Sequence, residues 1–129
     1  SMVVKNIAAL DHINILTNDV DSCRKFYIDG LGFEEGFRPS LNVPGMWLYL
    51  DEHPVVHIIE TIEALIGTTG TIDHIAFKAD DLDSFIKNLN EKGIEWSYRK
   101  IPDMDIHQIF VYDPNGVKIE FNFNAKEKL

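Results

Sequence analysis

The sequence predicts an α+β fold made of two copies of one βαβββ unit. One copy opens with Asp11-His12-Ile13, and the other opens with Asp73-His74-Ile75. In each copy an alternating strand pattern precedes an aspartate-led helix that ends at glycine, and three more strand patterns follow. A repeat of this length is one supersecondary unit used twice. Because one helix covers only one face of a sheet, the two units are expected to pack together as one domain.

The first unit is predicted over residues 8–60. Its first strand, 11–17, alternates apolar and polar residues. The helix after it is expected to be capped by Asp19 or Asp21 and to stop at a glycine. Short β-rich runs then predict three further strands, separated by a loop with proline and glycine and by a tight turn, at residues 33–38, 46–50 and 55–60.

The second unit is predicted over residues 71–123, after a linker at 61–70 that is rich in glycine and threonine. It begins with a strand at 71–78, and its helix starts at Asp81. Apolar residues recur in that helix at the spacing of one buried face, namely Leu82, Phe85, Ile86 and Leu89. The remaining strands, the last two joined by the turn sequence Asp-Pro-Asn-Gly, are expected at 95–100, 107–112 and 117–123.

Composition excludes several classes of partner. The net charge is −9, and an acidic chain repels phosphate backbones, so no nucleic-acid partner is expected. There is no basic patch and no apolar run of about 20 residues, so no membrane partner is expected either. The single cysteine, Cys23, permits no internal disulfide and sits beside apolar residues. We therefore interpret Cys23 as a small buried residue. The lone cysteine and the lack of a signal-peptide pattern predict a cytoplasmic protein.

Alternation along the strands gives each sheet an apolar face and a polar face. The apolar faces should pack on the helices, and they carry Ile13, Ile15, Ile75, Phe77, Val117, Ile119 and Phe121. The opposite faces are assigned His12, Asn14, Trp47, Tyr49, His74, Lys78, His107 and Glu120. Two sheets that curl around these side chains enclose a polar cleft with an aromatic rim. The residues expected to line its substrate pocket are Asn14, Trp47, Tyr49, Lys78 and Arg99.

Three residues on the cleft side form a candidate metal site. His12 and His74 take equivalent positions in the two units, and Glu120 lies on the last strand. Two imidazoles and one carboxylate, with coordination positions left open, suit a divalent ion that also holds substrate or water.

Two more histidines are candidates for the same site. If the turn at 51–54 is one residue shorter than the turn at 113–116, the repeat aligns His57 with Glu120, and His57 is then a fourth ligand or an acid/base group. Glu60 is the other candidate for that position, but alternation puts it on the opposite face of the strand. His107 is interpreted as an acid/base group, with a buried structural histidine as the alternative.

The chain resembles the vicinal oxygen chelate superfamily, which includes glyoxalase I, fosfomycin-resistance enzymes, extradiol dioxygenases and bleomycin-resistance proteins. The matching stretches are LDHINILTNDVDSCRKFYIDGLGF, IDHIAFKADDLDSF and FVYDPNGVKIEF, and the resemblance spans about residues 8–123. It implies an open mixed barrel centred on a divalent ion (Fe²⁺, Mn²⁺, Ni²⁺ or Zn²⁺) held by His12, His74 and Glu120. It also implies chelation of two adjacent substrate oxygens and stabilisation of an oxyanionic intermediate.

Departures from individual members of the superfamily limit what is carried over. Glyoxalase I-like proteins usually have glutamate where this chain has His57. Extradiol dioxygenases have an acid/base tyrosine where Phe110 stands, so that Tyr112 or His107 would have to replace it. Fosfomycin-type enzymes need cations, for which Lys78, Arg99 and Lys118 are the candidates. Bleomycin-binding members lack the metal triad, which this chain has.

The expected function is therefore that of a metal-dependent lyase or isomerase acting on a small, oxygen-rich metabolite. The alternatives are a single-domain Fe²⁺ extradiol-type dioxygenase and a protein that sequesters a drug or metabolite without turnover. A homodimer is expected, because the resemblance implies dimers. The modules can pair within one chain or swap between two chains, and the sequence does not choose between these arrangements.

Overall fold

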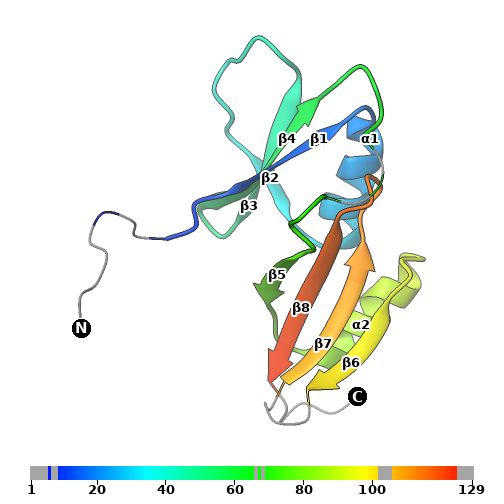
Figure 1. Ribbon diagram of the computed structural model, residues 1–129. Helices are drawn as coiled ribbons and strands as arrows, with labels where there is room; N and C mark the ends of the chain where they lie inside the picture. The colour runs from blue at the N-terminus through cyan, green and yellow to red at the C-terminus, as the bar shows by residue number, and fades with distance from the viewer. Residues whose placement is uncertain (1–5, 7–8, 66, 68, 102–105, 125–129) are drawn as a thin grey trace.

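The structure is a computed structural model, and it describes residues 6, 9–65, 67, 69–101 and 106–124. The described chain forms two four-stranded mixed sheets, each with a helix packed on one face (Figure 1). This arrangement confirms the predicted α+β fold of two βαβββ modules. Within a single chain the two sheets stand apart as two open surfaces and do not close into one barrel.

The first module has the strand order β1-β4-β3-β2. Strand β1 runs parallel to β4, and the other neighbours are antiparallel. Asp19 caps the helix, because its carboxylate accepts hydrogen bonds from the backbone N–H and the hydroxyl of Ser22. The elements are β1 (Ile13–Thr17), α1 (Val20–Cys23) continuing as the π-helix η1 (Arg24–Gly30), β2 (Glu34–Gly36), β3 (Gly45–Leu50) and β4 (His53–Glu60).

The second module repeats this topology with the order β5-β8-β7-β6. Its helix is capped by Asp81, whose side chain accepts from the backbone N–H of Ser84. The elements are β5 (Ile75–Lys78), α2 (Leu82–Glu91), β6 (Ser97–Ile101), β7 (Ile106–Tyr112) and β8 (Lys118–Asn124). The segment 102–105, between β6 and β7, lies outside the described residues.

The first strand of each module starts later than its sequence pattern suggests. Strand β1 begins at Ile13, and β5 begins at Ile75, because these are the first residues paired with β4 and β8. His12 and His74 therefore stand just before their strands, at equivalent places in the two modules. The first paired residue of the strand fixes the backbone next to each histidine, although the histidine itself is not part of the strand pairing.

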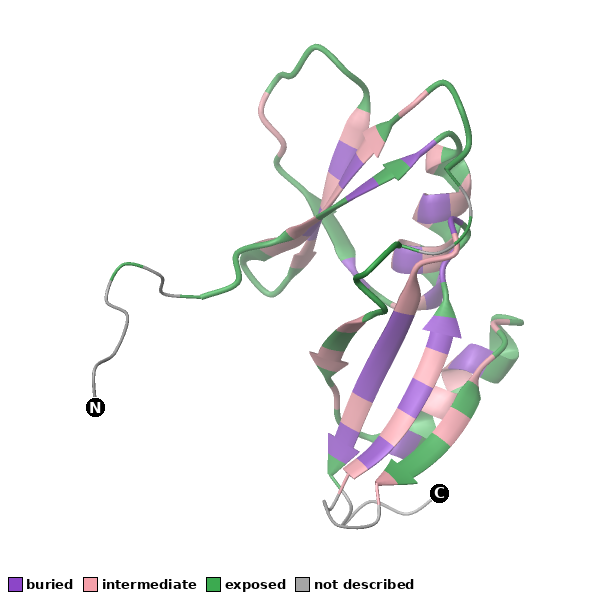
Figure 2. Ribbon diagram, in the orientation of Figure 1, coloured by how far each residue is buried: buried purple, intermediate pink, exposed green. Residues whose placement is uncertain are grey.

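The core lies between each sheet and its helix (Figure 2). On the helix-facing sides the strands bury an alternating series of apolar residues: Ile15, Met46, Leu48, Val56, Ile58, Ile109, Val111, Ile119, Phe121 and Phe123. Alternation leaves the opposite sides polar or half-exposed. Among the described residues, no helix is long and apolar enough to cross a lipid bilayer.

Buried polar contacts tie the two modules together at the turn between β7 and β8. The Tyr27 hydroxyl of η1 donates to Oδ2 of Asp113 at 2.7 Å. The Thr17 hydroxyl at the end of β1 donates to Oδ1 of Asn115 at 2.7 Å, and the Asn115 amide donates to Sγ of Cys23 at 3.3 Å. All five side chains are buried, so the junction fixes how one module sits against the other.

Candidate metal centre

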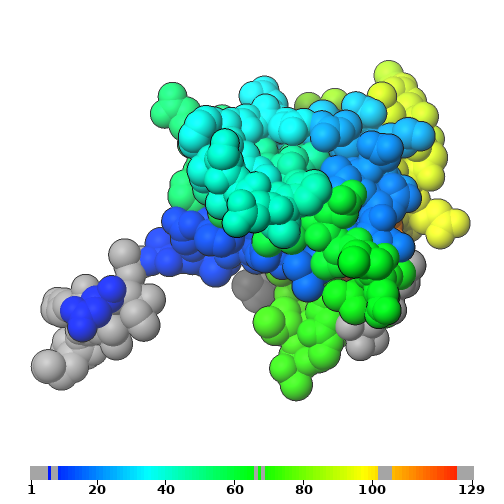
Figure 3. Space-filling view, turned by 90° about the horizontal axis from the view of Figure 1, so that it is seen from above, coloured from blue at the N-terminus to red at the C-terminus, as the bar shows by residue number. Residues whose placement is uncertain are grey.

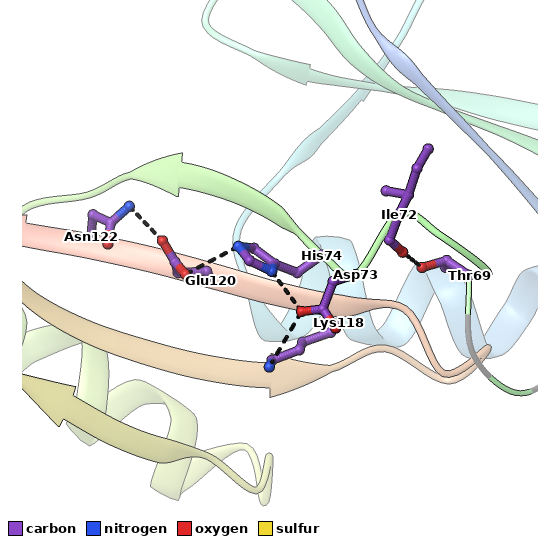
Figure 4. Close-up of polar contacts among 7 residues, drawn as sticks. All are labelled: Thr69, Ile72, Asp73, His74, Lys118, Glu120 and Asn122. Atoms are coloured by element: carbon purple, nitrogen blue, oxygen red, sulfur yellow. Dashed lines mark hydrogen bonds and ion pairs between the residues drawn. The ribbon is translucent and has the colours of Figure 1, made fainter.

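His74 and Glu120 form one half of the predicted metal site, on the open face of the second module (Figure 4). His74 stands just before β5, and Glu120 lies on β8, the strand that pairs with β5. The Nε2 atom of His74 is 3.3 Å from Oε1 of Glu120. Glu120 is a buried carboxylate with 8% exposure, whereas His74 is exposed.

Neighbouring groups fix the orientation of both side chains. The Nδ1 atom of His74 is 2.8 Å from Oδ2 of Asp73, and since a carboxylate only accepts, Nδ1 is the donor. The Asn122 amide donates to Oε2 of Glu120 at 2.8 Å. The hydrogen bond from His74, followed by the attraction of Lys118, holds the pKa of Asp73 below its usual value. Nε2 and Oε1 are therefore left to face one another.

The two facing atoms of this half-site are of the types that bind a divalent ion. When its only ring proton is on Nδ1, His74 presents a lone pair at Nε2, and Oε1 of Glu120 is also an acceptor. Two acceptors in contact repel each other unless a cation, whether a proton or a metal ion, stands between them. Ligands about 2.0–2.2 Å from one ion lie roughly 3 Å apart, which agrees with the observed 3.3 Å.

His12 takes the equivalent position in the first module. Its Nδ1 is 2.6 Å from Oδ2 of Asp11, so Asp11 orients His12 as Asp73 orients His74. The Asp11 backbone carbonyl lies 2.8 Å from Nε2 of His53. Hydrogen bonding to His12 keeps the pKa of Asp11 low. The histidine repeat is thus a repeat of an Asp-His pair with one common geometry.

His57 lies between two other rings in the first module. Its centroid is 3.7 Å from that of His12, with the planes 8° apart, and 4.0 Å from that of Trp47, with the planes 15° apart. Its Nε2 lies 3.2 Å from the Pro54 carbonyl oxygen. Burial, and then the neighbouring His12, lowers the pKa of His57.

The structure brings the four expected ligands together as two pairs. His12 contacts His57, and His74 contacts Glu120. In the part of the chain that is described, no three side chains of the metal-ligating types gather at one point. One chain therefore presents two half-sites on two separate open faces.

The other expected pocket residues lie on these same faces. Asn14 and Trp47 flank His57 across the first sheet. Tyr49 lies farther along the same face, and its hydroxyl donates to the Phe37 carbonyl at 2.6 Å. In the second sheet four paired residues form a row across the strands, here called the substrate row: Lys78, Asn122, Gln108 and Arg99. The row lies beside Glu120, because Asn122 follows Glu120 by two residues on β8 and so shares its face.

His107 lies on the wrong face for the expected catalytic role. In the register of β7 and β8, Phe110 is opposite Glu120, whereas His107 is opposite the buried Phe123. His107 therefore points to the helix side, where it is 6% exposed and its Nδ1 is 2.6 Å from the Tyr98 hydroxyl. The assignment to the cleft side is corrected, because alternation alone does not tell which face of a strand is which.

Four residues that support the half-sites were not identified from the sequence. They are Asp11, Asp73, His53 and Asn122. The two aspartates carry a signal, because the dipeptide Asp-His recurs at the same place in both units. His53 carries no such signal: it stands at the start of β4, and the pairing of β1 with β4 brings it to Asp11.

A separate cavity of about 320 Å³ lies where the linker meets β1 and β5. Its walls are mainly apolar and include Leu16, Leu65, Ile72, Ile75 and Val117. Seen from above, the linker lies on the surface beside the first module (Figure 3). None of the candidate metal ligands lines this cavity, although Asn14, which pairs with His57 across β1 and β4, does.

Two βαβββ modules, each with an Asp-His pair just before its first strand, define a protein of the glyoxalase-like class. The family model of the Glyoxalase/Bleomycin resistance protein/Dioxygenase superfamily matches residues 9–121. The chain belongs to this superfamily.

Similar proteins agree with this membership. YwkD of Bacillus subtilis, an uncharacterized protein, is 26% identical over 122 residues, covering 88% of this chain and 95% of its own. Metapyrocatechase of Geobacillus stearothermophilus is 28% identical over 122 residues, covering 88% of this chain. The match spans only 36% of that longer enzyme.

Solved structures show the same fold. A glyoxalase family protein from Bacillus anthracis superposes with a TM-score of 0.79 at 26% identity, covering 95% of this chain and 99% of its own. A point mutant of the fosfomycin resistance protein FosX from Listeria monocytogenes was solved with Mn(II) and 1S,2S-dihydroxypropylphosphonic acid. It superposes with a TM-score of 0.75 at 19% identity, covering 92% of this chain and 93% of its own.

Proposed function

We propose that this protein is a metal-dependent enzyme in which His12, His74 and Glu120 hold one divalent ion. The contact of 3.3 Å between His74 Nε2 and Glu120 Oε1 carries this proposal, because it presents two ligand atoms with their other polar atoms already bonded. Imidazole and carboxylate together suit Fe²⁺, Mn²⁺, Ni²⁺ or Zn²⁺. The Mn(II) bound by FosX, which shares the fold, is consistent with this set of ions.

The proposed reaction is a lyase or isomerase reaction on a small metabolite with two adjacent oxygens. When bound, the ion supplies Lewis-acid polarisation of a substrate oxygen. Asp11 and Asp73 keep the protons of His12 and His74 on Nδ1, so that each Nε2 atom keeps a lone pair for the ion. Asn122 holds Glu120 by Oε2 and leaves Oε1 available. His107 is left out of the reaction, because it lies on the helix side of the sheet.

We place the complete site between two copies of the chain. His12 and Glu120 belong to modules whose mutual position is fixed by buried bonds from Tyr27 to Asp113 and from Thr17 to Asn115. Folding the two open faces onto each other within one chain would break these bonds, at a cost of about 1–3 kcal/mol for each buried group left unpaired. A second copy brings its own second module to the first module without that cost, and the pair then has two equivalent sites.

The substrate row lies beside Glu120. Lys78 and Arg99 stand at the ends of the row, on the two edge strands, and the amides of Asn122 and Gln108 lie between them. Gln108 donates to Asn122, which in turn donates to Glu120. Two cations on the open face of an acidic chain favour an anionic substrate, such as a carboxylate or a phosphonate.

A ring-cleaving dioxygenase is the second candidate function, and the similarity to metapyrocatechase favours it. Phe110 lies opposite Glu120 and has no acidic proton. Tyr112 shares the face of Glu120 and is 61% exposed, so it is the group that would have to exchange protons. Oxygen consumption with catechol after anaerobic loading with Fe²⁺ separates the two candidates: consumption that is lost in Tyr112→Phe favours the dioxygenase.

Elemental analysis of the purified protein tests the metal proposal directly. We expect a transition metal in the wild-type protein or after loading with Mn²⁺, and its loss in His12→Ala and in Glu120→Gln. Lys87→Gln is the control, because Lys87 is an exposed residue of α2, outside both half-sites. Full metal content in His12→Ala, or none in the wild-type protein after loading, contradicts the proposal.

A further inference from the structure

We propose that His57 is a positioning residue, which holds the ring of His12 in a stack against Trp47 and does not itself bind the metal ion. This inference rests on the proposed function, because it assumes that His12 is a ligand. It replaces the two roles expected for His57, ligand and acid/base group, with a third role that the ring geometry favours.

The stack is built into the pairing of three strands. His57 lies on β4, opposite Trp47 on β3, and His12 precedes β1, the other neighbour of β4. Trp47 and His12 each stack on His57, and two rings nearly parallel to a third must take its two opposite faces. The order is therefore Trp47, His57, His12, with His12 outermost.

Parallel stacking prevents His12 and His57 from sharing an ion. The lone pair of an imidazole nitrogen lies in the ring plane, and bonds from imidazole to these ions are about 2.0–2.1 Å long. With centroids 3.7 Å apart and planes 8° apart, an ion in the plane of His12 stands roughly a full stacking distance out of the plane of His57. The His57 Nε2 is in addition 3.2 Å from the Pro54 carbonyl oxygen, to which it donates.

The stack completes the restraint of His12. The bond of 2.6 Å from Nδ1 to Asp11 fixes one edge of the ring but allows the ring to turn about that bond. Contact with the face of His57 removes this freedom, and Trp47 supports His57 from behind. In the second half-site His74 has Glu120 at its Nε2 and Asp73 at its Nδ1, so polar contacts restrain its ring. The stack of Trp47, His57 and His12 has no counterpart around His74 among the described residues.

The test compares His57→Phe, which keeps an aromatic face but has no ligand atom, with His57→Ala, which removes both. The readouts are the dissociation constant for Mn²⁺ and, on the Cu²⁺-loaded protein, the number of coordinated imidazoles from pulsed EPR. We expect His57→Phe to bind Mn²⁺ within about twofold of wild type and to keep the wild-type imidazole count. We expect His57→Ala to bind about tenfold more weakly, as for other supports of a ligand.

Trp47→Phe and Trp47→Ala repeat the comparison one ring farther from the ion. The conservative variant should keep the wild-type affinity, and the alanine variant should lose about as much as His57→Ala. Circular dichroism confirms that each variant is folded. If His57→Phe loses one imidazole and binds Mn²⁺ as weakly as His57→Ala, His57 is a ligand and this inference is wrong. If wild-type protein binds neither ion, the proposed function itself fails, which is a separate outcome.

Discussion

The hydroxyl of Tyr27 donates a hydrogen bond of 2.7 Å to Oδ2 of Asp113, and so joins the helix of the first module to the β7–β8 turn of the second. Asp113 uses its other oxygen to accept from the backbone N–H groups of Asn115 and Val117, each at 2.8 Å. One buried carboxylate therefore shapes the turn and also locks the modules. Because the lock lies behind the open faces, it leaves both half-sites presented outward.

Tyr27→Phe tests the module lock. Removing the hydroxyl leaves a buried carboxylate oxygen with one partner fewer, so we expect the free energy of unfolding to fall by about 1–3 kcal/mol. Chemical denaturation measures it. Phe26→Leu, on the same helix but outside the polar junction, is the control for packing changes. A loss no larger than that of the control contradicts a role for the hydroxyl.

The same pair gives a pH dependence. Burial, and then the Asp113 carboxylate, raises the pKa of Tyr27 well above its usual value. Ionisation is therefore harder in the folded state than in the unfolded chain, whose tyrosines titrate near pH ~10. The contribution of Tyr27 to stability is complete below that pH and is lost as the pH rises toward the folded pKa. The advantage of wild type over Tyr27→Phe should shrink above pH ~10. An advantage that stays constant between neutral and strongly alkaline pH would count against this assignment.

Asp73→Asn tests the orientation of His74. An amide offers Nδ1 either an acceptor oxygen or a donor nitrogen, so the tautomer is less well fixed. We expect the affinity for Mn²⁺ to fall about 10- to 100-fold, in the range found for groups that orient metal-binding histidines. Asp11→Asn should do the same in the first module, as the repeat of the Asp-His pair requires. Asp29→Asn, a carboxylate on η1 away from both half-sites, makes the same charge change and should have no effect.

Lys78→Gln and Arg99→Gln test the substrate row. If the row binds an anion, metal-loaded protein should bind inorganic phosphate, and each variant should bind it about tenfold more weakly, because a charge-assisted hydrogen bond is worth ~1.5–3 kcal/mol. Lys87→Gln, an exposed charge on α2, is the matched control. Calorimetric titration measures the affinity. Phosphate binding that all three variants weaken equally would point to net charge and not to the row.

The sequence predicted most of the fold because the repeat and the strand alternation are local signals. It identified His74 and Glu120 as partners, and the parallel pairing of β5 with β8 brings them into contact. It placed His107 on the wrong face, since the alternation of β7 becomes informative only through its register with β8, where Phe110 and not His107 is opposite Glu120.

The stack and the separation of the half-sites were beyond sequence reasoning for a different reason. The side chains of His12, His57 and Trp47 come from three strands or their ends, and their stacking depends on rotamers that no spacing encodes. The module lock joins Tyr27 to a residue 86 positions away. Contacts of this range follow from the packed tertiary structure and not from local pattern.

The most direct test of the account is metal binding by a mixed pair of inactive chains. His12→Ala and Glu120→Gln, each carrying a different affinity tag, are co-expressed, and the pair bearing both tags is purified and analysed for bound metal. A site shared between two copies leaves one intact site in the mixed pair, so it should hold half as much metal as the wild-type pair, while each variant alone holds none. Absence of metal from the mixed pair, with full metal in wild type, would show that no site is built across two chains.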